Sequence, residues 1–113
     1  MAEFAFAIPV VPGQEELDRK TLGEMNGARR DEYEAAARRA GITRQIVWHQ
    51  QTPQGTVAVV YVEADDPLAA LDEFGSSDEP FNSWFRDQMK EVHGIDISEP
   101  GPPSEQVFDS GMT

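Results

Sequence analysis

The order of apolar and polar residues along the chain predicts alternating strands and helices. Phe4 to Ile8 alternates large and small apolar side chains with a period of two, which is typical of a strand. From Gln14 to Ala40 the apolar residues recur at helical spacing. Asn26-Gly27 predicts a break in this helical region, and Gly41 is suited to the position just after its end.

The next segment predicts an antiparallel β-hairpin. Ile42 to Gln51 and Thr56 to Ala64 are both rich in strand-forming residues. Between them lies Thr52-Pro53-Gln54-Gly55, in which proline presets φ and glycine accepts a positive φ. The two runs are therefore expected to pair across a short turn.

A second helical region follows the hairpin. Asp66 is suited to the N-cap and Pro67 to the first helical position. Gly75 to Asp78 interrupts the pattern, and a further helix is predicted from about Glu79 to His93, ended by Gly94.

The last part of the chain predicts a linker and one more strand. Residues 99–104 are rich in proline and glycine, and a strand is expected over Glu105 to Asp109. The order β-α-β-β-α-β predicts an α+β, ferredoxin-like fold, in which a four-stranded antiparallel sheet carries helices on one face. Residues 1–113 suffice for one domain of this kind.

Both sets of alternate positions in the predicted strands are apolar. One set contains Phe4, Phe6, Ile8, Ile42, Ile46, Trp48, Val57, Val59 and Tyr61. The other contains Ala5, Ala7, Val47, His49, Ala58, Val60 and Val62. A sheet that is apolar on both faces needs two covers, and the helices of the chain supply one. We therefore expect a homodimer in which a second copy covers the other face.

Composition narrows the possible partners. The chain has 9 basic and 21 acidic residues, a net charge of −12, which argues against a nucleic-acid partner. The absence of cysteine excludes disulfides and thiolate chemistry and fits a reducing compartment. No apolar run approaches the roughly 20 residues that cross a bilayer, and the first residues do not resemble a secretory signal. We expect a cytoplasmic protein with no membrane partner.

Four short motifs carry a resemblance to a known group of proteins. They are Thr52-Pro53-Gln54-Gly55, Asp66-Pro67, the run from Pro80 to Phe85, and His93-Gly94-Ile95-Asp96. Together with the element order, they resemble a bacterial family of unknown function within the dimeric α/β-barrel superfamily. That superfamily includes antibiotic-biosynthesis monooxygenases and haem-degrading monooxygenases. The resemblance implies a two-fold dimer whose sheets face each other.

The resemblance also implies a pocket for a small hydrophobic or aromatic molecule. We predict His49 as its catalytic base, because histidine titrates near neutral pH. Trp48, Tyr61, Trp84 and Phe85 are predicted to bind the substrate. A cofactor-independent oxygenase, an isomerase or a cyclase would fit such a pocket, and so would a binding protein without catalysis. Phe85 also continues an apolar helical stripe, which core packing alone explains.

Haem binding is the alternative that the resemblance implies. Haem-degrading members place a tryptophan and a histidine on the second helix, as Trp84 and His93 are placed here, and the histidine would be the axial ligand. Those members also have an asparagine on the first strand, where this chain has Ala5 and Ala7. His93 equally suits a purely structural position at a helix end. Apart from haem we expect no cofactor and no metal, and a catalytically silent dimeric module is the third alternative.

Overall fold

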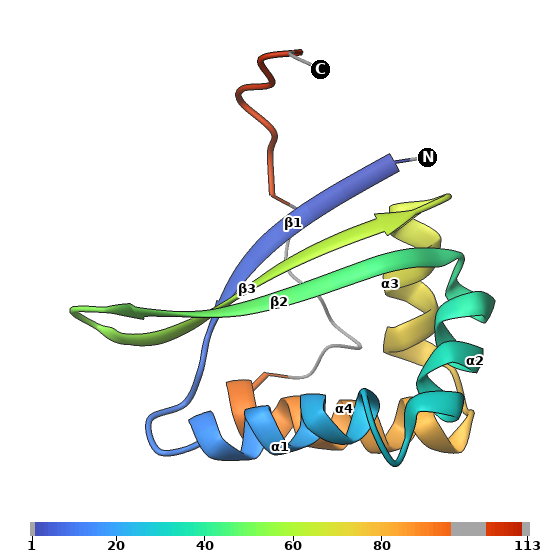
Figure 1. The fold of residues 1–113 in the computed structure, drawn as a ribbon, viewed down its shortest axis with the longest axis horizontal. Helices are drawn as coiled ribbons and strands as arrows, with labels where there is room; N and C mark the ends of the chain where they lie inside the picture. Colours follow the sequence, from blue (N-terminus) through green and yellow to red (C-terminus); the bar gives the residue numbers. More distant parts are fainter. Residues whose placement is uncertain (1, 96–103, 112–113) are drawn as a thin grey trace.

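The computed structural model describes residues 2–95 and 104–111 of the chain. It has the α+β architecture predicted from the sequence, with a three-stranded antiparallel sheet and four helices (Figure 1). In chain order the elements are β1 (Ala2–Pro9), α1 (Glu15–Met25), α2 (Arg30–Ala40), β2 (Ile42–Thr52), β3 (Gly55–Ala64), α3 (Pro67–Ser76) and α4 (Pro80–His93). β3 lies in the middle of the sheet, between β1 and β2.

The local sequence signals end the elements as predicted. Both helical regions break into two helices, and Gly41 and Gly94 follow α2 and α4 with φ of 76° and 69°. This left-handed conformation is costly for residues that carry a Cβ atom. The Asp66 side chain accepts hydrogen bonds from the backbone N–H groups of Leu68 and Ala69, with Pro67 at the first position of α3. The predicted hairpin is formed by β2 and β3.

The register of the strands corrects the predicted composition of the two sheet faces. Phe4 lies opposite Val62, and Val47 lies opposite Val60, so these four side chains share one face. The predicted grouping of Phe4 with Val57 and Val59 on one face is therefore wrong. A β-bulge between Ile42 and Arg44 also separates Ile42 from Ile46 and Trp48, because the extra residue reverses the alternation.

The predicted fourth strand is absent from the described structure. Glu105 to Asp109 forms no strand, and residues 104–111 are exposed along their whole length. Val107 and Phe108 are 85% and 80% exposed. The segment projects beyond the sheet, on the side away from the helices (Figure 1). The fold is therefore compatible with a ferredoxin-like arrangement, but residues 2–95 and 104–111 form three strands and not four. The predicted linker lies almost wholly outside the described residues.

The helices pack on one face of the sheet, which we call the inner face (Figure 1). The buried core is divided into three clusters rather than forming one block. One lies where α2 and α3 meet the sheet and includes Ala40, Val62 and Ala70. A second lies toward the hairpin end and contains Val10, Ala58 and Val92. The third joins helix to helix through Met25, Ala36 and Phe81.

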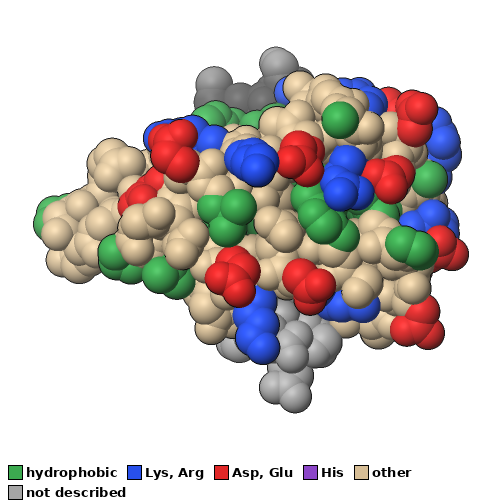
Figure 2. Space-filling view, turned by 90° about the horizontal axis from the view of Figure 1, so that it is seen from below, with side chains coloured by type: hydrophobic (Ala, Val, Ile, Leu, Met, Phe, Trp, Pro, Cys, Tyr) green, Lys and Arg blue, Asp and Glu red, His purple; other side chains and the backbone are tan. Residues whose placement is uncertain are grey.

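The outer surfaces of the two layers differ in character. Seen from the side of α1 and α4, acidic and basic side chains are interspersed and hydrophobic groups form small separate patches (Figure 2). The outer face of the sheet carries instead Ala5, Ala7, Ile46, Trp48, Val57 and Val59. All four helices lie on the other side of the sheet (Figure 1), and Trp48 is 52% exposed. The sheet is thus apolar on both faces, as predicted, and the helices cover one.

In the part of the chain that the structure describes, no helix is long and apolar enough to cross a bilayer.

Candidate functional site: a cavity beneath the sheet

A cavity of about 310 Å³ lies between the inner face of the sheet and the helices. We call it the inner cavity. Its apolar lining includes Phe4 and Phe6 from β1, Val60 from β3, Phe74 from α3, and Phe85 and Met89 from α4. The core clusters hold the layers together around it, so this volume is left unfilled. Its size is at the lower end of the range for small-molecule sites.

Few polar side chains line the inner cavity, and Asp18 is the most deeply buried of them. Its carboxylate is 2% exposed and lies 2.6 Å, Oδ2 to Nε2, from His49. His49 is 12% exposed and extends from β2 on the inner face, opposite Ala58. The pair links α1 to the sheet. A carboxylate bonded to one ring nitrogen fixes the orientation of a histidine ring.

Asp18 was missed in the sequence analysis, although the chain carried a signal for it. Asp18, Thr21 and Met25 are all buried and stand at i, i+3 and i+7 on one face of α1. Two polar residues on the apolar face of a helix indicate buried partners. Thr21 finds its partner in Gln88 of α4, 3.3 Å away.

His93 is the second histidine near the inner cavity and lines it directly. It is the last residue of α4, and its Nδ1 lies 2.8 Å from the carbonyl oxygen of Pro9. A carbonyl accepts a hydrogen bond and cannot donate one, so Nδ1 carries a proton in this contact. In the neutral ring Nε2 then holds the lone pair. His93 therefore has one nitrogen suited to accept a proton or to bind a metal.

The predicted aromatic residues do not gather in one pocket. Phe85 lines the inner cavity and packs edge-on against Phe74, with ring centroids 5.4 Å apart. Trp48 and Tyr61 lie on the outer face of the sheet. Trp84 faces away toward α2, where the Arg29 guanidinium lies 4.1 Å from its ring centroid. The structure thus brings only Phe85 and His93 to the inner cavity, with His49 adjacent through Asp18.

Tyr61 belongs to a polar cluster at one end of the outer face. Its hydroxyl lies 2.7 Å from Glu3 Oε2 and 2.9 Å from Glu63 Oε2. Glu3 and Glu63 stand directly opposite each other on β1 and β3. The hydrogen bond to Glu3, with partial burial and the second carboxylate, raises the pKa of the Tyr61 phenol well above its usual value. Two like charges that stand opposite each other on neighbouring strands repel. A hydroxyl within hydrogen-bond distance of both carboxylates offsets that repulsion, so the cluster has a structural explanation.

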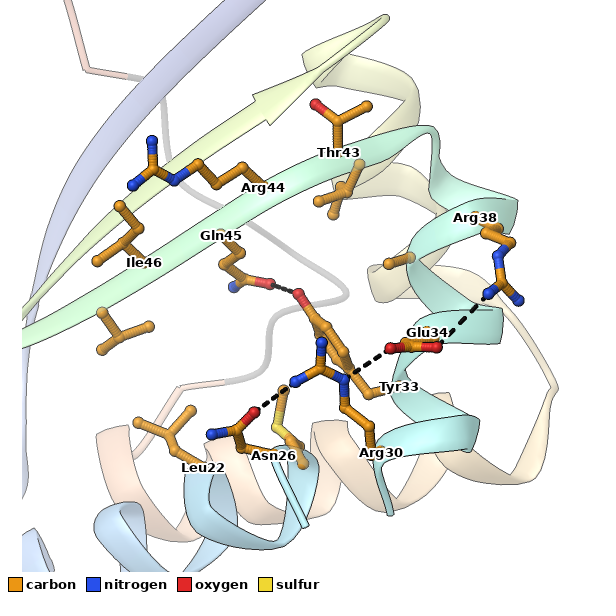
Figure 3. Close-up of a pocket in the computed structure, with 14 residues that line it drawn as sticks. Leu22, Asn26, Arg30, Tyr33, Glu34, Arg38, Thr43, Arg44, Gln45 and Ile46 are labelled. Carbon is orange, nitrogen blue, oxygen red and sulfur yellow. Dashed lines mark hydrogen bonds and ion pairs between the residues drawn. The ribbon is translucent and has the colours of Figure 1, made fainter.

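A second, more open cavity of about 660 Å³ lies at the edge of the sheet between α2 and β2 (Figure 3). We call it the edge pocket. Tyr33 from α2 donates a hydrogen bond of 2.8 Å to Gln45 Oε1 of β2 across this space (Figure 3). Arg30 bonds to Asn26 Oδ1, and its Nε lies 2.7 Å from Glu34 Oε1. The edge pocket is therefore the polar counterpart of the inner cavity.

Two groups in the edge pocket have shifted pKa values. Burial raises the pKa of the Tyr33 phenol, an effect that the Arg30 charge partly offsets. The hydrogen bond and charge of Arg30, together with the charge of Arg38, lower the pKa of the Glu34 carboxyl. At neutral pH Tyr33 is thus a neutral donor and Glu34 a carboxylate.

Neither a metal site nor a similarity to a known protein indicates the function of this chain. Within residues 2–95 and 104–111, no group of three or more His, Asp or Glu side chains is arranged to hold a metal ion. No protein-family model, curated protein or solved structure matches the chain. The geometry of the two cavities is the remaining guide to function.

Proposed function

We propose that the chain binds a small hydrophobic or aromatic molecule in the inner cavity. The observation that carries this proposal is an unfilled volume of about 310 Å³ with a mainly apolar lining. A concave site with an apolar and aromatic lining and few polar groups is the usual form of a small-molecule site. Asp18, Gln45 and His93 supply the few polar contacts that orient a ligand in such a site.

Proton transfer is the chemistry that these side chains support. His93 offers Nε2 as an acceptor, and the Asp18–His49 pair lies at the cavity wall. A cofactor-independent oxygenase, an isomerase or a cyclase acting on an electron-rich molecule begins with removal of a proton. His49, the base predicted from the sequence, would act through Asp18, whereas His93 would meet the ligand itself. A binding protein would use the same contacts without turnover.

Titration with N-phenyl-1-naphthylamine, a neutral dye that fluoresces in apolar surroundings, tests the binding proposal. Val60→Phe should fill the inner cavity and weaken dye binding at least tenfold, since Val60 lines it and is 7% exposed. Val59→Phe is the matched control, one residue along β3 but on the outer face. Equal dye binding by both variants would contradict the proposal.

Haem binding is the second candidate, and His93 favours it. With Nδ1 bonded to the Pro9 carbonyl, Nε2 suits an axial iron ligand. The rest of the site fits haem less well. Trp84 lies toward Arg29, and the part of the lining that the structure describes contains no Lys or Arg to pair with the haem carboxylates. A hemin titration without a shifted Soret band, or with the same band in His93→Ala, would exclude this candidate.

We further propose that the outer face of the sheet is the interface of a homodimer, as in a dimeric α/β barrel. The exposed apolar strip around Trp48 supports this, because a large apolar patch left in water is unfavourable. Trp48→Lys should shift the protein from dimer to monomer, as measured by size-exclusion chromatography with light-scattering detection. Lys90→Ala, on the exposed part of α4, serves as control. A wild-type monomer would contradict the proposal, and a dimer without ligand or turnover would favour the silent module.

The cytoplasmic location of the protein remains a prediction.

A further inference from the structure

We infer that the ligand is an amphipathic anion, with its apolar body in the inner cavity and its charged group at Arg30 in the edge pocket. This inference rests on the proposed function, because it assigns a ligand class to the same site. The inner cavity alone explains the apolar body. The arginine side chains of the edge pocket are the reason for expecting a negative charge on the ligand.

The two cavities adjoin beneath the sheet. Leu22, Ile42, Gln45 and Val47 belong to the lining of both. A ligand that occupies both cavities would pass between these four side chains. The end of such a molecule in the inner cavity meets mainly apolar side chains, and its other end meets polar ones.

The edge pocket lies in a positively charged part of an acidic protein. The whole chain carries a net charge of −12, and of the five arginines in residues 29–44, Arg29 and Arg39 pair with Glu24 and Glu73 on neighbouring elements. The charged side chains that line the pocket are three arginines, Arg30, Arg38 and Arg44, and one carboxylate, Glu34, and Arg44 also pairs with Glu63 of β3, 3.8 Å away. This is an electrostatic setting that favours an anion locally, within the roughly 8 Å over which charges act at physiological salt.

Arg30 is the side chain best placed to hold the charged group. Figure 3 shows its guanidinium between Asn26 and Glu34, whereas Arg38 lies on the outer side of α2. An arginine has five N–H donors, and the contacts to Asn26 and Glu34 engage two of its nitrogens. The remaining donors can bind a carboxylate, sulfonate or phosphate oxygen. Arg30 is 53% exposed, so an incoming anion can reach it.

The charges also fix the orientation of the ligand. Asp18, inside the inner cavity, would repel an anionic group placed there. A charge buried among Phe4, Val60 and Phe85 would in addition lose its hydration without a partner. At the junction of the cavities, Gln45 uses Oε1 for Tyr33, and its amide N–H groups can donate to a ligand oxygen. The apolar end must therefore enter first.

A matched pair of dyes tests the inference. N-phenyl-1-naphthylamine and 8-anilino-1-naphthalenesulfonate share an anilinonaphthalene body, and only the second carries a negative charge. We expect the sulfonate to bind about tenfold more tightly, the value of one charge-assisted hydrogen bond. Arg30→Gln should remove this preference and leave binding of the neutral dye unchanged. Arg19→Gln, at a similarly exposed arginine of α1 that lines neither cavity, should change sulfonate binding less than twofold.

A second variant tests the same inference in the opposite direction. Glu34 competes with the ligand for Arg30, so Glu34→Gln should tighten sulfonate binding about threefold and leave the neutral dye unaffected. Near-ultraviolet circular dichroism verifies that both variants are folded.

The outcomes separate this inference from the proposed function. The neutral dye could bind in the inner cavity, with its binding lost in Val60→Phe, while the sulfonate is not preferred or Arg30→Gln has no effect. That result would overturn the anion inference alone. Failure of both dyes to bind would overturn the proposed function and this inference with it. Sulfonate binding that survives Val60→Phe but is lost in Trp48→Ser would place the dye on the outer face and also overturn the inference.

Discussion

The two faces of β3 carry nearly the same side chains but lie in different surroundings. Val60 and Val62 point to the inner face and are 7% and 3% exposed, whereas Val57 and Val59 point outward and are only partly buried. A β-branched residue suits either face of a strand, so the side chain itself does not determine its burial. The helices cover the inner face, and none of the helices of the described residues lies on the outer one (Figure 1).

The two faces of the sheet also differ in which part of their surface is left uncovered. On the inner face the helices contact the sheet near its two ends and leave a cavity between them. The outer face is apolar around Trp48 and polar around Tyr61. A cavity within a packed layer suits a small molecule, and an open apolar face suits a protein surface. The two faces therefore suit the two proposals, binding of a small molecule on the inner face and formation of a homodimer on the outer face.

The largest expected effect concerns the polar pair on the inner face. Asp18→Ala should lower the free energy of unfolding by about 3 kcal/mol, because it leaves His49 buried without its partner. Urea denaturation at pH 7 measures the change, with an unchanged m-value as evidence of a common unfolding transition.

A double-mutant cycle identifies the origin of this effect. His49→Ala combined with Asp18→Ala should cost much less than the sum of the two single substitutions, because the residues are in direct contact. Additive effects would show that the pair does not link α1 to the sheet.

The next effect compares the two faces within one strand. Val62→Ala should cost about 2 kcal/mol, the value of two buried methyl groups with some cavity formation. Val59→Ala, three residues earlier and on the outer face, should cost less than 1 kcal/mol in the monomer. Protein concentration sharpens the comparison. In a dimer that buries the outer face, the cost of Val59→Ala should rise with concentration, and that of Val62→Ala should not.

The smallest effect concerns the two tyrosines of the chain, one on α2 and one on the outer face. Burial raises the pKa of Tyr33, and the hydrogen bond to Glu3 raises that of Tyr61, so both should titrate above pH 10 in the folded protein. In urea both should ionise near pH 10. Absorbance at about 295 nm follows the ionisation, and Tyr61→Phe leaves Tyr33 alone to be assigned.

The sign of the linked stability change follows from these shifts. A raised pKa in the folded state stabilises the protein below the unfolded value of about 10, and the contribution is lost as the pH rises further. The stability difference between wild type and Tyr61→Phe should therefore be constant from pH 6 to 9 and shrink above pH 10. A difference that grows above pH 10 would contradict the proposed hydrogen bonds of Tyr61.

Features set by neighbouring residues could be predicted from the sequence. Asp66-Pro67 caps α3, Gly41 and Gly94 end helices, and the turn around Pro53 joins the hairpin. In each case the residues that carry the signal also make the contact or adopt the required backbone angle. The class of the fold follows from the order of such elements.

Features that depend on distant partners were predicted poorly. A run such as Glu105 to Asp109 forms a strand only against a free sheet edge, which its own composition cannot guarantee. The face that a strand residue occupies depends on register with its neighbours, and so the aromatic pocket containing Trp48 and Trp84 was not formed. The position of Asp18 on the apolar face of α1 indicates a buried residue, but its partner His49 is 31 residues away in the sequence.

The bulge at Thr43 has a consequence for how this protein tolerates changes in chain length. One extra residue there brings Ile42 and Val47 to the inner face, although they are an odd number of positions apart. Deleting Thr43 would put α2 and the rest of β2 out of phase, turning either Ile42 or the Gln45–His49 stretch toward the wrong side. Most substitutions at this exposed position should be tolerated, whereas loss of the residue should not. Variants with insertions and deletions should therefore avoid the start of β2 and be concentrated in the turn at Pro53 and Gln54.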